Sequence, residues 1–334
     1  MSKTKLRDTD FLFLSAYIAA KSTHLLNENT CARMLDAASF AECAKLLEAC
    51  GYPDVSGLRA EQIDAVLAAH RDEVFAELAQ LSPCKALVDV FRCKYDYHNA
   101  KALIKAEGAN VDGAYLLSGA GRVEKTKLMD AFHEENYGAL PEKLGKAVEA
   151  ARGILARTEN PQLADFALDR AYFEELSALA GETGSEFLIG YVKVMIDSAN
   201  LRSAVRTLRM GRGADFLRQA LIPGGDCGTA QILASAASAE SLAGLFGSGR
   251  LRRAAELVAE AVGGSGLTAF EKACDNCVSG YLAGASRQSF GEAPVIAYIA
   301  AVENEIAAAR MILTGRLSGV NAARIKERLR EMNA

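Results

Sequence analysis

Three asparagines recur at nearly equal spacing, and each stands inside a long run of helix-forming residues. Asn99, Asn200 and Asn304 follow one another at intervals of about a hundred residues. A small residue comes three positions after each asparagine, and a basic residue comes six positions after it: Lys105, Arg206 and Arg310. A period of this kind indicates similar supersecondary units that follow one another along the chain. The sequence therefore predicts three helical units, spanning 1–110, 111–214 and 215–334.

The helical positions of these residues predict a structural role for them. Six residues turn an α-helix by about 240°, so each asparagine and its basic residue lie on different faces and cannot form one catalytic pair. Asn99 instead shares a face with Asp96 and Leu103; Asp197 corresponds to Asp96, whereas the third copy has Ala301. We expect each asparagine to bind a neighbouring helix or loop, because a buried, unpaired amide costs roughly 1–3 kcal/mol.

Composition and periodicity both favour helices over strands. Alanine and leucine dominate, half of the residues are hydrophobic, and tryptophan is absent. No convincing alternation of apolar and polar residues marks a strand, so the predicted fold class is all-α. Loops are expected at 110–121 and 222–228. Helices are expected at 11–26, 31–49, 61–81, 84–107, 124–137, 141–158, 161–181, 185–210, 231–237, 239–246, 250–262, 267–283, 294–315 and 321–332.

Charge and hydropathy exclude several classes of protein. The net charge of -4 and the pI near 5.8 give no electrostatic basis for binding nucleic acid. No window of about eighteen uninterrupted apolar residues predicts a membrane span. The apolar stretch at 11–20 is short and lacks a clear cleavage site, so it is not typical of a signal peptide. With eight cysteines that mostly lie in helix-like runs, we expect a reduced, cytoplasmic protein.

The candidates for chemistry are weak. Cys274 and Cys277 have the spacing of metal ligands, but a structural zinc site needs four ligands, and the nearest other thiol is Cys227. His98 is a candidate general base without a nucleophile beside it. The glycines at 211–213 and 244–249 follow no strand and are typical of helix ends. The sequence therefore predicts no catalytic, cofactor-binding or metal-binding residues.

A basic stripe runs along the second asparagine-bearing helix. Its members recur at spacings of three and four, which places them on one helix face. Such a stripe is either a solvated surface or a docking surface for an acidic partner. The residues are Arg202, Arg206, Arg209 and Arg212.

Ordered motifs along the chain resemble one known family. The stretch 293–329 resembles the closing signature of the C subunits of the V-type (A/V-type) ATP synthase family, to which the eukaryotic d subunit is related. It does so through Pro294, Tyr298, Glu303, Glu305, Ile306, Arg310, Ile312, Leu313, Gly315 and Arg316. The first-unit signature is matched by Asp96, Asn99, Lys101, Leu103 and Lys105, and the second by Asp197, Asn200, Leu201, Arg202 and Arg206.

The resemblance runs from about residue 10 to residue 330. The family's opening helix is matched by Tyr17, Leu25 and Leu26, although Lys21 stands where arginine is expected. The segment 34–52 fits the family as well. The glycine-rich region 214–290 matches least.

The resemblance implies a funnel of three similar helical units around a pseudo-threefold axis. It implies a non-catalytic part of a rotor, without a cofactor, on the cytoplasmic face of the membrane. Its partners would be the central shaft, formed by the D and F subunits, and the membrane ring of proteolipid subunits. The role requires rigidity rather than chemistry, and polar docking surfaces would make binding dependent on salt.

The alternative is an unrelated helical scaffold, or an enzyme that uses the polar cluster at 95–105. An enzyme gathers unique polar residues in one cleft and perturbs their titration there. A socket repeats one motif around an opening. Because the cluster is echoed twice in the chain, we interpret it as a structural joint.

Overall fold

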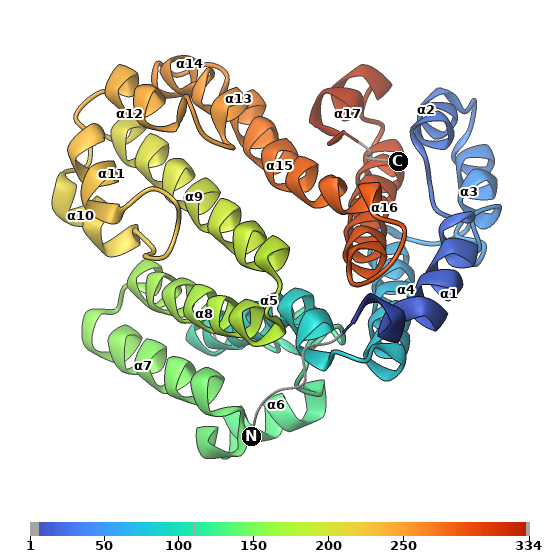
Figure 1. Cartoon of the computed structure of the whole chain (residues 1–334), viewed down its shortest axis with the longest axis horizontal. Coiled ribbons are helices and arrows are strands. Elements are labelled where there is room, and N and C mark those ends of the chain that lie inside the picture. The colour runs from blue at the N-terminus through green and yellow to red at the C-terminus, as the bar shows by residue number, and fades with distance from the viewer. Residues whose placement is uncertain (1–6, 110, 332–334) are drawn as a thin grey trace. The chain divides into compact units, whose positions relative to one another are not determined.

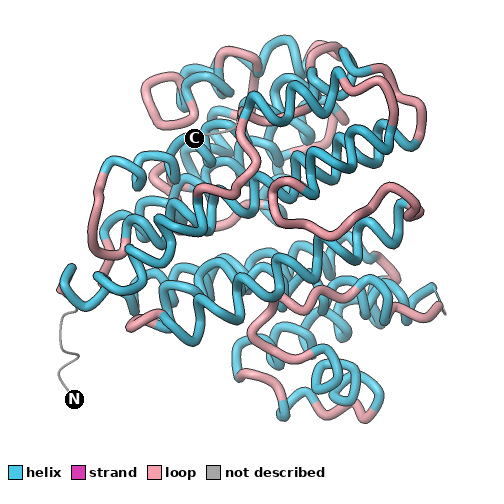
Figure 2. Tube along the Cα trace, turned by 90° about the vertical axis from the view of Figure 1, so that its right-hand side faces the viewer, coloured by secondary structure: helices cyan, strands magenta, loops and turns pink. Residues whose placement is uncertain are grey.

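The computed structural model describes residues 7–109 and 111–331, and every regular element in that part of the chain is a helix (Figures 1 and 2). The all-α prediction is confirmed. The chain separates into two compact units. The terminal unit comprises the residues up to Pro83 and those from Thr268 onward, and the central unit comprises Cys84–Leu267. The three-way division at 110 and 214 is not tested by this separation and stays a prediction.

The terminal unit is built around α16 (Ala293–Leu317). This helix carries buried residues on several faces, among them Ile299, Val302 and Ile312. A helix that is apolar on several faces is stable only when other elements surround it. The elements that contact α16 are α1 (Leu12–Ser22), α2 (Glu28–Asp36), α3 (Phe40–Glu48), α4 (Ala60–Leu81), η4 (Gly284–Arg287) and α17 (Ala322–Arg328). Two further elements are η1 (Asp8–Phe11) and α15 (Leu267–Ala283), whose first residue belongs to the central unit.

The central unit joins two long helices, α5 (Lys85–Ala109) and α9 (Glu186–Arg209), through α8 (Pro161–Thr183). α8 packs on α5, on α7 (Glu142–Thr158) and on α9 (Figure 1). Leu168 and Leu176 place the buried face of α8 in this core. The shorter elements are η2 (Ala114–Leu116), α6 (Lys125–His133), η3 (Tyr137–Ala139), α10 (Ala214–Ala220), α11 (Thr229–Ser235), α12 (Ala239–Phe246), α13 (Arg252–Ala255) and α14 (Val258–Val262).

Local capping divides segments that periodicity predicts as single helices. The predicted helix at 31–49 is wrong, because α2 ends at Asp36 and α3 begins at Phe40. Ser39 accepts a hydrogen bond from the amide of Glu42 at 3.1 Å, which starts a new helix. The predicted helix at 250–262 is likewise two short helices, α13 and α14.

Other helix ends also differ from the prediction. The predicted helix at 124–137 ends at His133, because Glu135 has a positive φ of 52° that no α-helix accommodates. The sequence did not predict α10, a short helix just after Gly213. The first predicted helix, 11–26, ends at Ser22, and the last ends at Arg328. Asn110 and Met332, which bound predicted segments, lie outside the described residues.

Candidate functional site

The first repeated asparagine binds the backbone of a loop. Asn99 is fully buried on α5. Its Nδ2 donates to the carbonyl of Ser118 at 2.8 Å, and the amide of Ser118 donates to its Oδ1 at 2.8 Å. We call residues 112–123 the first returning loop. A side-chain amide that pairs with both the backbone N–H and the backbone C=O of one residue fixes that loop against the helix.

One helical turn earlier, Asp96 holds the end of the same loop. Its carboxylate accepts the backbone amides of Arg122 and Val123 at 2.8 and 3.1 Å. A Cβ at Gly121 would overlap this carboxylate, so glycine permits the close approach. Burial raises the pKa of Asp96, and the charge of Arg122 opposes this effect.

A buried ionic network ties the first returning loop to α8. Arg122 pairs with Asp96 through Nε at 2.7 Å and with Glu175 through Nη1 at 2.9 Å. The hydroxyl of Tyr97 donates to Glu175 at 2.9 Å. The network therefore joins α5, the loop and α8. Neither Arg122 nor Glu175 was predicted as a site residue. The local signal for Arg122 was its place directly after Gly121, and Glu175 had no local signal.

The second repeated asparagine makes the same contact in the other half of the central unit. Asn200, also fully buried, donates to the carbonyl of Ile222 and accepts its amide, both at 2.8 Å. Asp197 accepts the amides of Asp226 and Cys227 at 3.1 and 3.2 Å. Burial raises the pKa of Asp197 to about 6, with both backbone amides opposing the shift. A Cβ at Gly225 would again overlap the carboxylate.

The third asparagine has different surroundings. Asn304 is partly exposed on α16 and lines two cavities of the terminal unit. The next residue, Glu305, is almost fully buried instead. It accepts the amide of Leu26 at 2.7 Å and the hydroxyl of Tyr52, and Nε2 of His70 lies 4.0 Å away. Burial raises the pKa of Glu305.

Lys105 and Arg310, two of the repeated basic residues, form equivalent ion pairs. Lys105 lies 2.8 Å from Asp165, the fifth residue of α8, and Arg310 lies 2.7 Å from Asp64, the fifth residue of α4. The pairs are half-exposed, and exposed pairs contribute about 0–1 kcal/mol each. Arg206 is exposed on α9. The pairing supports the internal repeat more than it supports stability.

The four arginines of the basic stripe do not share one environment. Arg202 is half-buried, whereas Arg206, Arg209 and Arg212 are exposed. Arg209 donates to the carbonyls of Ala261 and Gly264 at 3.0 and 3.1 Å, just after α14. The guanidinium of Arg212 lies 5.8 Å from the ring centre of Phe216. At least these two residues contact their own chain.

The residues considered for chemistry lie apart. His98 is exposed on α5, while Asp96, Tyr97, Asn99 and Lys105 of the same helix bind groups of the protein itself. Cys274 is buried in α15, Cys277 is half-buried, and neither forms a disulfide bond. Within residues 7–109 and 111–331, no three histidine, cysteine or acidic side chains are grouped to hold a metal ion. In the same part of the chain, no helix has the length and hydropathy needed to cross a membrane.

Comparisons with known proteins agree in one assignment. The family model described as ATP synthase (C/AC39) subunit matches residues 14–328. The C subunit of a V-type sodium ATPase from Enterococcus hirae is 24% identical over 324 residues, which cover 96% of this chain and 98% of the relative. The C subunit of an A-type ATP synthase from Methanocaldococcus jannaschii is 25% identical over 343 residues, covering 96% of this chain and 86% of the relative. The C subunit of a V-type ATP synthase from Thermus thermophilus is 24% identical over 237 residues, covering 65% of this chain and 72% of the relative.

Asn99 and Asn200, the two fully buried asparagines of the repeat, hold loops of their own chain, which is a structural contact. The chain belongs to the ATP synthase (C/AC39) subunit family, and is a non-catalytic subunit of a rotary ATPase complex. The predicted resemblance is confirmed.

Proposed function

We propose that this chain is the rotor socket that couples the central shaft of a V/A-type rotary ATPase to its membrane ring. The observation that carries the proposal is the family match over residues 14–328. Relatives that match nearly the whole chain are named as the C subunits of a V-type sodium ATPase and of an A-type ATP synthase. In this role the chain transmits torque between ATP turnover and ion translocation and makes or breaks no bond itself.

We propose three similar helical units, divided near 110 and 214, around a pseudo-threefold axis. Three observations support the repeat: the paired asparagines Asn99 and Asn200, the equivalent ion pairs of Lys105 and Arg310, and an acidic fifth residue in a third helix, Glu271 of α15. Each unit would offer an equivalent long helix to one central opening, which suits the grip of a shaft.

The proposed partners are the D and F subunits of the shaft on one side and the proteolipid ring on the other. We place the chain on the cytoplasmic face of the membrane, as a peripheral part of the complex. The buried network of Asp96, Arg122 and Glu175 suits this role, because three joined elements resist deformation under torque. Of the arginine stripe, Arg212 is the residue we propose for contact with an acidic partner surface.

The test is removal and replacement of the chain in membranes that contain the assembled ATPase. Without the chain, we expect the catalytic part to hydrolyse ATP while ATP-driven ion transport is lost, and re-addition to restore transport. A tagged chain should also recover both shaft proteins and the proteolipid after mild solubilisation. Full ion transport without the chain, or recovery of neither partner, would contradict the socket and reopen the scaffold alternative.

A further inference from the structure

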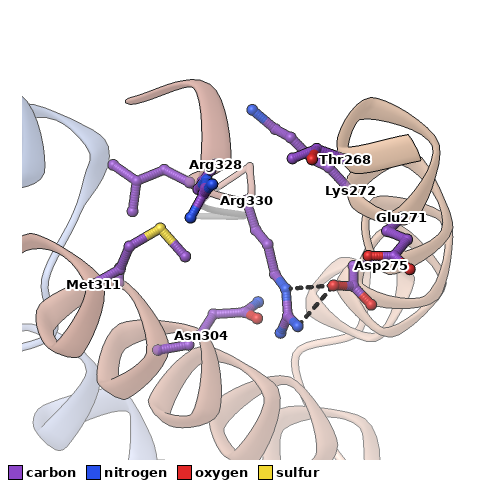
Figure 3. A pocket seen from close by; sticks show the side chains of 11 residues that line it. Thr268, Glu271, Lys272, Asp275, Asn304, Met311, Arg328 and Arg330 are labelled. Carbon is purple, nitrogen blue, oxygen red and sulfur yellow. Dashed lines mark hydrogen bonds and ion pairs between the residues drawn. The ribbon is translucent and has the colours of Figure 1, made fainter. Parts of the chain in front are cut away.

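Two cavities of the terminal unit lie along one face of α16. The larger has a volume of 560 Å³ and the smaller one of 330 Å³. Asn304 lines both, and Figure 3 shows its amide beneath Arg330 in the smaller cavity. Residues spaced by three or four lie on one helix face. The face that connects the cavities, here called the α16 groove, carries Ala297, Ala301, Asn304, Ala308 and Met311.

The internal repeat shows what occupies this face elsewhere in the chain. When Asn304 is aligned with Asn99, the five groove residues correspond to residues of α5 that the first returning loop covers. Asp96 and Asn99 bind its backbone, and Nε of Arg92 donates to the carbonyl of Ala120 at 3.2 Å. The full set on α5 is Arg92, Asp96, Asn99, Leu103 and Ala106.

The beginning of the first returning loop, at Gly113, also lies against these residues of α5. A Cβ at Gly113 would stand 2.7 Å from Cβ of Ala106 and 3.5 Å from Cδ2 of Leu103. The loop therefore runs antiparallel to α5, with Gly113 at Ala106 and Gly121 at Asp96. On α9, the segment from Ile222 to Cys227 covers Asn200 and Asp197 in the same direction.

On α16 the chain that follows the helix takes another course. Its last described segment is held by α15, where Arg330 pairs with Asp275 at 2.7 Å and Lys272 donates to the carbonyl of Glu327 at 2.9 Å. This segment forms a wall of the smaller cavity (Figure 3) and, within the described residues, makes no hydrogen bond to Asn304. Within residues 7–109 and 111–331, no segment makes with Asn304 the contacts that the returning loops make with Asn99 and Asn200.

We propose that the α16 groove seats an extended polypeptide segment of a partner chain, whose backbone pairs with the amide of Asn304. The partner segment would take the position on α16 that the chain's own returning loops take on α5 and α9. Small side chains at Ala297, Ala301 and Ala308 leave room for the backbone to approach. Because Ala301 replaces the aspartate of the other copies, the segment needs no glycine at that point.

The charged residues that line the smaller cavity predict that the bound partner segment carries an acidic residue. The charged side chains at the smaller cavity are three cations and two anions: Lys272, Arg328, Arg330, Glu271 and Asp275. Asp275 is already paired with Arg330, which leaves Lys272, Arg328 and Glu271 and a net charge of +1. Lys272 donates to the carbonyl of Glu327, so we assign the acidic residue of the segment to Arg328, at the Met311 end of the groove. On α5 the corresponding end, near Ala106, receives Asp112 and Gly113 of the first returning loop. The proposal is independent of the rotor role.

A peptide copy of the first returning loop is the probe. The peptide DGAYLLSGAG, residues 112–121 with a fluorophore at its C-terminus, is titrated against the full chain and followed by fluorescence anisotropy. We expect saturable binding that weakens at least about tenfold in Ala301→Phe, which fills the groove, and in Asn304→Ala, which removes two hydrogen bonds. Ala150→Phe, at an exposed alanine of α7, is the matched control and should bind like the wild type.

A second peptide tests the charge. In this second peptide, asparagine replaces the single aspartate. At low salt it should bind the wild-type chain severalfold more weakly than the first peptide does, whereas Arg328→Ala should bind both peptides equally. Thermal unfolding of every variant establishes that a loss of binding is not a loss of fold.

Each other outcome overturns the proposal. Absence of saturable binding, or binding that neither groove variant weakens, rules out the groove as a peptide seat. Weakening by Ala301→Phe without any effect of Asn304→Ala contradicts recognition of the backbone. Dimerisation of the chain that Ala301→Phe abolishes would assign the groove to a second copy rather than to a partner segment.

Discussion

Asn99 and Ser118 exchange two hydrogen bonds of 2.8 Å, and Asn200 and Ile222 repeat the exchange with the same two distances. In both cases a side-chain amide on a long helix pairs with the backbone N–H and C=O of one buried loop residue. The contact suits an amide, whose acceptor oxygen and donor nitrogen are separate atoms that reach the N–H and the C=O of one residue at the same time; a carboxylate has no donor, and a hydroxyl has only one oxygen for both roles.

The three repeated asparagines differ in burial, so their substitution should lower the free energy of unfolding by different amounts. We expect Asn99→Ala and Asn200→Ala each to lower the free energy of unfolding by about 1–3 kcal/mol, because a buried carbonyl and amide lose their partners. Asn304→Ala should change it by less than about 0.5 kcal/mol, since Asn304 is partly exposed. Urea denaturation of the three variants measures the difference. Equal costs at all three positions would show that Asn304 is also a structural joint.

Asp197 should make stability depend on pH. Its pKa is raised from 3.8 to about 6 in the folded protein, so the native state keeps a proton that the unfolded chain releases. The resulting stabilisation is complete below about pH 4 and is lost as the pH rises through 6, with a total of about 3 kcal/mol. Asp197→Asn removes it. Unfolding free energies at several pH values between 4 and 7.5 should therefore show the wild-type advantage over Asp197→Asn shrinking as pH rises; an advantage independent of pH would contradict the raised pKa.

Breaking a buried ion pair should lower the free energy of unfolding more than breaking an exposed one, as urea denaturation can measure. Arg122→Ala leaves Asp96 and Glu175 buried without their cation, and we expect it to cost about 3–5 kcal/mol. Arg310→Ala breaks only a half-exposed pair with Asp64 and should cost at most about 1 kcal/mol. High salt should reduce the cost of Arg310→Ala and leave that of Arg122→Ala nearly unchanged. Similar costs for both would mean that the Arg122 network is solvated.

Substitutions at two arginines of the stripe should have different effects: one should lower the stability of the chain, and the other should weaken its binding to the rest of the ATPase. Arg209→Ala removes hydrogen bonds to the carbonyls of Ala261 and Gly264, so we expect a loss of about 1 kcal/mol in stability. Arg212→Glu should leave unfolding nearly unchanged and weaken binding to the rest of the ATPase, most strongly at low salt. Reconstitution at two salt concentrations measures this. Unchanged binding of Arg212→Glu would remove the stripe from the proposed interface.

His98→Ala tests the enzyme alternative. His98 is exposed on α5, and its neighbours Asp96 and Tyr97 are engaged in the buried network. We expect the variant to assemble normally and to support unchanged ATP turnover and ion transport in the complex. A loss of either activity with normal assembly would show that the polar cluster contributes chemistry.

Much of the secondary structure follows from local pattern. The long helices α4, α5, α8, α9 and α16 lie close to their predicted bounds, because sustained apolar periodicity over six turns leaves little choice of conformation. Errors fall where one residue acts locally, as Ser39 does when it caps α3 and Glu135 does when its φ turns positive. Periodicity averages over such single positions and cannot register them.

The candidate site was predicted in kind but not in its partners. The spacing of Asn99 and Lys105 excluded a shared face, and the aspartate one turn before Asn99 indicated a polar joint. Nothing local identified Ser118, Ile222 or Asp165 as the groups that would be bound, because a peptide unit or a surface carboxylate has no distinctive sequence pattern. From the sequence, the three copies were predicted to be equivalent apart from Ala301.

By itself the sequence determined the all-α class and the family and predicted the repeat, because periodicity and motif order are properties of the chain alone. The tertiary structure decided which of the repeated asparagines are covered by a loop. Asn99 and Asn200 are covered because the loops that follow α5 and α9 fold back over them. Within the described residues no loop binds the amide of Asn304, and the segment after α16 is held on α15 through Arg330 and Asp275. Which surface a returning segment covers depends on competition between contacts far apart in sequence, and that competition is settled only when the helices have packed.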